Sequence, residues 1–176
     1  MGKKKIVIVN GFPRSGKDTF VDFCLEQLGP YGIKVSTVDF VKNLATQCGW
    51  DGTKTLENRK FLSDLKDLLT EWGDVPYHKV MSVIEDHFFG LWQFDLEDNG
   101  VAFVMCREPK EIQKFVDRNE AITVLIRRDS VENLETSNHA DSEVLNYKYN
   151  VVFYNNYDLD HLKIAAKEFV DYLKNL

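Results

Sequence analysis

Residues 5–19 read Lys-Ile-Val-Ile-Val-Asn-Gly-Phe-Pro-Arg-Ser-Gly-Lys-Asp-Thr, and this stretch decides the fold. Its β-branched run, residues 6–9, predicts a short strand that is buried on both faces. Gly11, Gly16 and Lys17 then have the spacing GxxxxGK. They come directly after that strand and directly before a helix-like segment, which is the context that a phosphate-binding loop requires. The other interpretation is an ordinary glycine-rich turn between a strand and a helix.

The chemistry of phosphate binding explains the residues of this loop. The two glycines permit backbone conformations that let the chain wrap closely around a phosphate. The inward N–H groups form an anion nest, and the N-terminus of the next helix adds positive potential. Lys17 supplies a mobile positive charge for the β- and γ-phosphates, where charge shifts during transfer. We therefore predict a nucleotide-binding set made of Gly11, Arg14, Ser15, Gly16, Lys17, Asp18 and Thr19.

Asp18 stands where many phosphate loops carry a serine or threonine that donates its hydroxyl to magnesium. The run Gly-Lys-Asp-Thr resembles the GKGT of adenylate kinases, in which a residue without a hydroxyl also separates the lysine from the threonine. Asp18 either touches Mg²⁺ through water or serves as a favourable carboxylate in the first turn of a helix. The sequence leaves both roles open.

The rest of the chain alternates strand-like and helix-like segments, which indicates an α/β fold with a parallel sheet. Further strands are predicted at residues 33–38, 101–106, 121–126 and 151–154. Helices are predicted at residues 17–28 and 56–72, and from Pro76, Pro109 and Asp158 onward. The polar segment 127–145 has no clean period, and we expect it to be mobile.

Composition excludes several classes of protein. The 176 residues, 44% of them hydrophobic, suffice for one domain with a sizeable core, 1–176. No apolar run approaches the roughly 20 residues of a membrane span, and the net charge of −6 argues against nucleic-acid and anionic-membrane partners. Cys24, Cys48 and Cys106 lack CxxC spacing, so we expect a reduced, cytoplasmic setting. The four histidines indicate no catalytic or metal site. The oligomeric state stays open, a homodimer included.

Six segments, the first of which contains the loop, match a known family and occur in the same order as in that family. They are NGFPRSGKDTFVDF, VDFVKNLA, NRKFLSDLKDLLTEW, CREPKEI, TVLIRR and HADSEVLNYKYNVVFYNNYDLDHL. With them the sequence resembles the phage-type deoxynucleoside monophosphate kinases, within the P-loop nucleoside monophosphate kinase group. The resemblance implies a three-layer αβα fold with a parallel sheet of about five strands. It also implies an acceptor-binding helical insert at about 40–98, a lid at about 127–145, and the use of ATP and Mg²⁺.

The resemblance extends to the acceptor side, where the acceptor would be a small phosphorylated molecule. Asp39 and Lys42 follow the second strand, at the edge where open α/β sheets bind ligands. Arg59, Ser63 and Lys66 share one helix face, which either reaches an acceptor phosphate or is a solvated surface.

Arginines are expected to act at the strand ends. Arg107 ends the third strand and would clamp a phosphate bidentately. Arg127 and Arg128 end the fourth strand where the lid begins, and at least one of them would stabilise the transferring group. We therefore expect Lys17, Arg107, Arg127 and Arg128 to be catalytic, and Asp39, Lys42, Arg59, Lys66 and Arg107 to bind the acceptor.

One departure from the family concerns magnesium. In many relatives the third strand ends in an acidic residue, whereas here Cys106 stands at the end and Glu108 follows two residues later. Magnesium would then rest on the triphosphate, on water, on Asp18, and on Glu108 or Asp39. Three alternatives remain open: a kinase for another acceptor, of the dephospho-coenzyme A or phosphomevalonate type, a switch or motor ATPase, and a nucleotide-binding module without catalysis. The absence of NKxD and DxxG motifs disfavours a GTPase switch.

Overall fold

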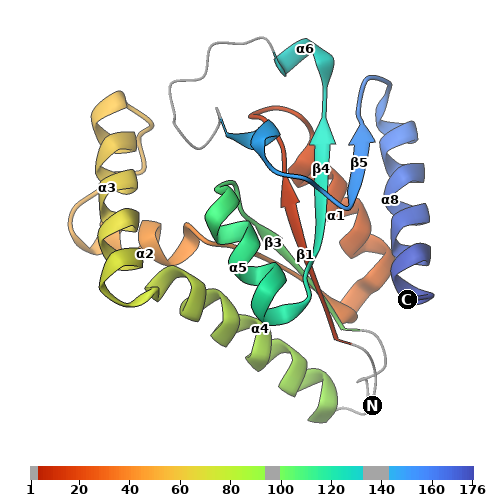
Figure 1. Ribbon diagram of the computed structural model, residues 1–176, viewed down its shortest axis with the longest axis horizontal. Coiled ribbons are helices and arrows are strands. Elements are labelled where there is room, and N and C mark those ends of the chain that lie inside the picture. The colour runs from red at the N-terminus through yellow and green to blue at the C-terminus, as the bar shows by residue number, and fades with distance from the viewer. Residues whose placement is uncertain (1–3, 94–99, 133–142) are drawn as a thin grey trace.

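The computed structural model describes residues 4–93, 100–132 and 143–176. Within them lies one sheet of five parallel strands in the order β2-β3-β1-β4-β5. Helices cover both faces of this sheet, and a separate group of helices stands to one side (Figure 1). The fold class predicted from the sequence, a three-layer α/β fold with about five parallel strands, is confirmed.

The strands match the predicted segments closely. They are β1 (Lys5–Asn10), β2 (Gly32–Ser36), β3 (Val101–Met105), β4 (Ile122–Arg127) and β5 (Val151–Tyr154). β1 lies at the centre, with Ile8 paired to Val104 of β3 and to Thr123 of β4. All four pairings are parallel, so the carboxyl ends of all the strands meet at one edge.

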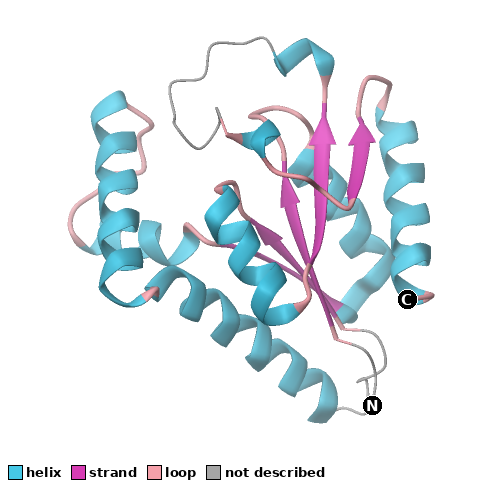
Figure 2. Cartoon of the chain, in the orientation of Figure 1, coloured by secondary structure: helices cyan, strands magenta, loops and turns pink. Residues whose placement is uncertain are grey.

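The helices form the outer layers, as the colouring by secondary structure shows (Figure 2). They are α1 (Lys17–Leu28), α2 (Asp39–Gln47), α3 (Leu56–Gly73), α4 (Val75–Gln93), α5 (Pro109–Asn119), α6 (Asp129–Glu132) and α8 (Leu159–Lys174). Helix α2 was not predicted from the sequence, although the resemblance implied a helical region there. The 3-10 turns Gly29–Tyr31 and Val144–Asn146 complete the described elements. The predicted mobile segment is in part a helix, α6, and residues 133–142 lie outside the described residues.

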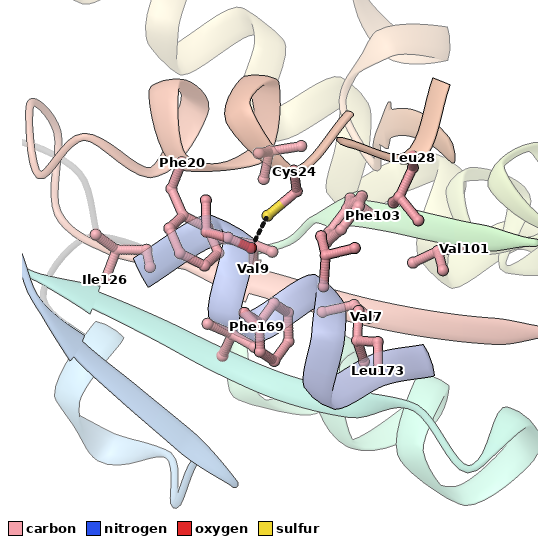
Figure 3. Close-up of a cluster of buried hydrophobic side chains, with 14 of the residues drawn as sticks. Val7, Val9, Phe20, Cys24, Leu28, Val101, Phe103, Ile126, Phe169 and Leu173 are labelled. Atoms are coloured by element: carbon pink, nitrogen blue, oxygen red, sulfur yellow. Dashed lines mark hydrogen bonds between the residues drawn. The ribbon is translucent and has the colours of Figure 1, made fainter. Parts of the chain in front are cut away.

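The first core layer lies between the sheet and helices α1 and α8 (Figure 3). Val7 and Val9 of β1 face this layer, where Phe20 packs on Phe153 and Phe169 with ring centroids 4.9 and 5.8 Å apart. Cys24 lies fully buried here, and its thiol donates a hydrogen bond to the Ala166 carbonyl, 3.7 Å away. Burial raises the pKa of Cys24 to about 12, which fits an inert thiol in the core.

The second core layer lies on the opposite face of the sheet. Ile6 and Ile8, which alternate with Val7 and Val9, pack there against helices α4 and α5. Their partners include Ile84, Phe88, Ile112 and Phe115. Because both faces are covered by helices, the strands are apolar without alternation, as their sequence indicated.

Helix α3 differs from its prediction in the face that it buries. Its apolar positions follow the expected helical period, but Leu68 and Trp72 are 62% and 80% exposed. Lys66, which we placed on the opposite face, is only 7% exposed. The inner face of α3 is therefore partly ionic, which hydrophobic periodicity could not reveal. None of the helices in the described parts of the chain is long and apolar enough to cross a membrane.

The same substitution, Phe→Ala, should change the free energy of unfolding very differently at a buried and at an exposed position. Phe103 is fully buried on β3, next to the central strand, whereas Phe89 on α4 is 55% exposed. We expect Phe103→Ala to lower the free energy of unfolding by about 3–5 kcal/mol, because it removes apolar contacts and leaves a cavity. Phe89→Ala, the matched control, should cost less than about 1 kcal/mol. Urea denaturation measures both, and equal losses would contradict this assignment of the core.

Candidate nucleotide-binding and transfer site

The predicted phosphate loop connects the carboxyl end of β1 to the first residue of α1. Gly11 has a φ of 155° and Gly16 a φ of 93°. A side chain at Gly11 would come within 2.5 Å of the Ile126 carbonyl oxygen and 2.6 Å of Ser15 Oγ. Arg14 is itself left-handed, with a φ of 67°. The loop is thus a tightly turned segment pressed against the end of β4.

Asn155 holds the loop from the other side. It directly follows β5, where its backbone N–H donates to the Arg127 carbonyl at 2.7 Å and its Nδ2 donates to the Ser15 carbonyl at 2.8 Å. A Cβ at Gly16 would collide with that same Nδ2. Asn155 was not predicted as a site residue from the sequence. Its position directly after the fifth strand, at the edge where ligands bind, was the available signal.

The polar groups inside the loop fit a phosphate. Ser15 Oγ is buried and has no hydrogen-bond partner within the described structure, and a buried hydroxyl of this kind is rare unless a ligand completes it. Lys17 is also buried, and its Nζ donates to the Phe12 carbonyl at 3.4 Å. Thr19 is half-buried and Asp18 is exposed, both in the first turn of α1. This cradle of backbone turns, hydroxyl and ammonium is suited to an oligophosphate.

Asn10 connects the loop to two other parts of the site. Its Oδ1 accepts from the Gly11 N–H at 2.8 Å, while its Nδ2 donates to the Arg107 carbonyl at 3.0 Å. The same Nδ2 donates to the Tyr149 hydroxyl at 2.7 Å, which in turn donates to the Val144 carbonyl at 2.8 Å. Burial raises the pKa of Tyr149, so this hydroxyl stays protonated. The buried Asn10 thus joins the start of the loop to the end of β3 and to the segment that follows the predicted lid.

The predicted acceptor residues lie after β2 and β3 at the same edge of the sheet, or on helices α2 and α3. Arg107, half-buried, follows β3, and the exposed Asp39 accepts from the Ser36 N–H at 2.9 Å, after β2. Lys42 on α2 and Arg59 on α3 are exposed. Lys66 is not exposed, because its Nζ forms ion pairs with Glu108 and Glu111. The structure therefore joins Lys66 to the Arg107–Glu108 junction, although its charge is already matched there.

The two predicted lid arginines have different surroundings. Arg127 donates to Glu132 of α6 from both Nε and Nη2, at 2.7 and 2.5 Å, and its guanidinium lies over the Tyr154 ring. The hydrogen bond to Glu132 raises the pKa of Arg127, and the same bond lowers that of Glu132. Arg128 is exposed and lines a surface hollow together with Asn155, Tyr157 and Asp158. Since Asn155 also braces the loop, this hollow borders the phosphate cradle.

The described residues offer few protein ligands for a magnesium ion. Among the described residues, no three histidine, cysteine or acidic side chains gather as metal ligands would. Asp18 is the acidic residue within the loop's first helical turn. Mg²⁺ in phosphate-transfer sites keeps several waters and uses one or two carboxylates together with substrate phosphates. The residues present fit such an ion if the nucleotide carries it and the exposed Asp18 would reach it through water.

Comparisons with known proteins leave the family open. No family model matches the chain, and no curated protein matches its sequence. A solved structure of a mutant of the APS kinase CysC from Mycobacterium tuberculosis is similar at 13% sequence identity. The match covers 99% of each chain with a TM-score of 0.47. A similarity this distant carries no argument about the site, which therefore rests on its own geometry.

The loop geometry predicts different effects on ATP binding for alanine substitutions at two glycines that have nearly the same φ. Gly16 and Gly49 have φ values of 93° and 96°, but a Cβ at Gly16 meets Asn155 whereas a Cβ at Gly49 meets nothing within 4 Å. We expect Gly16→Ala to weaken ATP binding strongly, because either the loop shifts or the Asn155 amide gives up its hydrogen bond to the Ser15 carbonyl to relieve the collision. Gly49→Ala carries the same backbone strain, about 1–2 kcal/mol, and should bind ATP normally. Calorimetric titration with ATP compares them, and normal binding by Gly16→Ala would refute the cradle.

Proposed function

We propose that this chain is a P-loop phosphotransferase that moves the γ-phosphate of ATP to a nucleoside or deoxynucleoside monophosphate, giving a nucleoside diphosphate. The observation that carries the proposal is the cradle of Gly11, Ser15, Gly16 and Lys17 at the carboxyl edge of the sheet, with the guanidinium-bearing Arg107 on the neighbouring strand end. Asn10 bonds directly to both, which ties the donor side to the acceptor side.

On the donor side, the loop would hold the β- and γ-phosphates. Ser15 Oγ supplies a hydroxyl that lacks a partner within the described residues, and Lys17 exchanges its weak contact with the Phe12 carbonyl for phosphate oxygens. The nucleoside would lie over the hollow lined by Arg128 and Tyr157, where a guanidinium and an aromatic ring offer stacking surfaces for a base.

On the acceptor side, Arg107 follows β3 and Asp39 begins α2 after β2, while Lys42 and Arg59 are exposed on α2 and α3. The guanidinium groups would bind the acceptor phosphate, for which their planar forks are suited. The acceptor's identity rests on the sequence resemblance. Enzymes for other phosphorylated acceptors, such as dephospho-coenzyme A or phosphomevalonate, would use the same donor site.

The transfer itself would need positioning and charge stabilisation more than proton transfer. A phosphate oxygen of the acceptor is already a nucleophile, so it attacks the γ-phosphorus in line while the bond to the β-phosphate oxygen breaks. Lys17 and Arg107 stabilise the charge that moves between these oxygens. Arg127 would join them by exchanging its two hydrogen bonds to Glu132 for hydrogen bonds to phosphate oxygens. Magnesium, when bound to the triphosphate, supplies further charge neutralisation.

A coupled ADP-release assay with Mg-ATP and a panel of ribo- and deoxyribonucleoside monophosphates tests the function. We expect turnover that requires one or more monophosphates and that falls at least about 100-fold in Lys17→Ala, since the γ-phosphate loses its cation. Lys167→Ala, at an exposed position on α8, is the control and should leave the rate unchanged.

Two other outcomes have clear meanings. If only a non-nucleotide phosphorylated acceptor stimulates ADP release, the chain is a kinase of a different acceptor class. If ATP binds but none of these acceptors stimulates release, the chain is a nucleotide-binding module, and the kinase proposal fails.

Arg107 provides a test of the acceptor side. Arg107→Lys keeps the positive charge and loses the planar fork, so we expect kcat/KM for the acceptor to fall about 10–100-fold while the KM for ATP changes little. Arg118→Lys is a matched control, because Arg118 pairs with Asp74 at the far end of α5. Equal kinetics in Arg107→Lys and wild type would remove Arg107 from the acceptor site.

A further inference from the structure

The most deeply buried ionic contact in the described structure joins the helical insert to the sheet. Lys66 lies on the inner face of α3, 7% exposed. Its Nζ is 2.8 Å from Glu108 Oε1 and 2.7 Å from Glu111 Oε2. Glu108 directly follows Arg107, and Glu111 lies in the first turn of α5. One ammonium thus connects α3 to the junction between β3 and α5.

Glu111 fixes this contact to the body of the protein. Its side chain is 9% exposed, and its Oε2 accepts from Thr37 Oγ1 at 3.4 Å and from the Cys106 thiol at 3.5 Å. Thr37 follows β2 and Cys106 follows β3. The carboxylate is therefore held from two strand ends, and Lys66 brings α3 to it.

The charge balance keeps Lys66 where it is. Burial alone would lower the pKa of Lys66, but the two carboxylates outweigh burial and raise that pKa above its usual value. Moving the ammonium to an acceptor phosphate would leave Glu111 buried and unpaired, which is strongly unfavourable. The remaining contacts of α3 are mainly with α2 and α4, and in Figure 1 the helix stands well apart from the sheet.

We propose that Lys66 is a positioning residue: it locks helix α3 to the Arg107–Glu108 junction and so sets the affinity for the acceptor without binding it. Arg59 lies two turns before Lys66 on the same helix face, so the direction of that face depends on the lock. The proposal rests on the proposed function for its kinetic readout, and on the structure alone for its ordering of α3.

A charge-neutral double variant distinguishes this role from direct phosphate binding. Lys66→Met leaves two carboxylates facing each other, whereas Lys66→Met with Glu111→Gln removes the buried charge as well. We expect K66M to raise the acceptor KM about tenfold or more with the ATP KM unchanged, and the double variant to recover most of that loss. Lys60→Met, which breaks an exposed pair with Asp64, is the matched control and should match wild type.

Hydrogen exchange supplies a readout that needs no turnover. Residues 56–73 should exchange faster in K66M than in wild type, and should regain protection in the double variant, with α1 and α8 unchanged. A double variant that regains protection but keeps the high KM would show that Lys66 binds the acceptor directly, and would overturn the proposal. Unchanged protection in K66M would overturn it as well. If wild type turns over no acceptor, the proposed function fails, and the exchange data still decide whether the lock exists.

Discussion

The structure depends on how closely the loop after β1 approaches the ends of β4 and β5. Gly11 lies against the Ile126 carbonyl and Gly16 lies against the Asn155 amide, so neither position has room for a Cβ. Because the loop follows the carboxyl end of β1 and leads directly into α1, the N-terminus of α1 lies at the carboxyl edge of the sheet. The order β2-β3-β1-β4-β5 then brings Arg107 and Arg127 to either side of that loop.

Much of this arrangement was predictable from short-range signals. Continuous β-branched runs indicated strands buried on both faces, and the GxxxxGK spacing placed the loop between β1 and α1. Parallel strands ending at one edge also predicted that Asp39, Arg107 and Arg127 would share that edge. Each of these inferences uses only local pattern and a general rule of α/β topology.

The contacts that could not be predicted join residues far apart in the sequence. The contact of Asn155 with Ser15 spans 140 positions, and that of Lys66 with Glu111 spans 45. The period of α3 favoured an inward stripe with Leu68 and Trp72, yet those side chains are exposed and an ionic residue is buried instead. The inner face of α3 meets two carboxylates, and a buried carboxylate without a partner is strongly unfavourable. The helix therefore buries the lysine that pairs with them, although its apolar period favours another face.

Arg127 and Lys66 are each paired with a carboxylate, but the two ion pairs differ in their access to water. Glu132 sits on the four-residue helix α6, and its side chain is 13% exposed beside an Arg127 that is 29% exposed. Water reaches this pair, so Glu132 would be solvated if Arg127 turned to a phosphate as proposed. Lys66 and Glu111 are each 9% exposed in their side chains, and Glu111 is held by two strand ends. In the proposed transfer, the accessible pair would therefore be suited to exchange partners, whereas the buried pair would be suited to hold α3 in place.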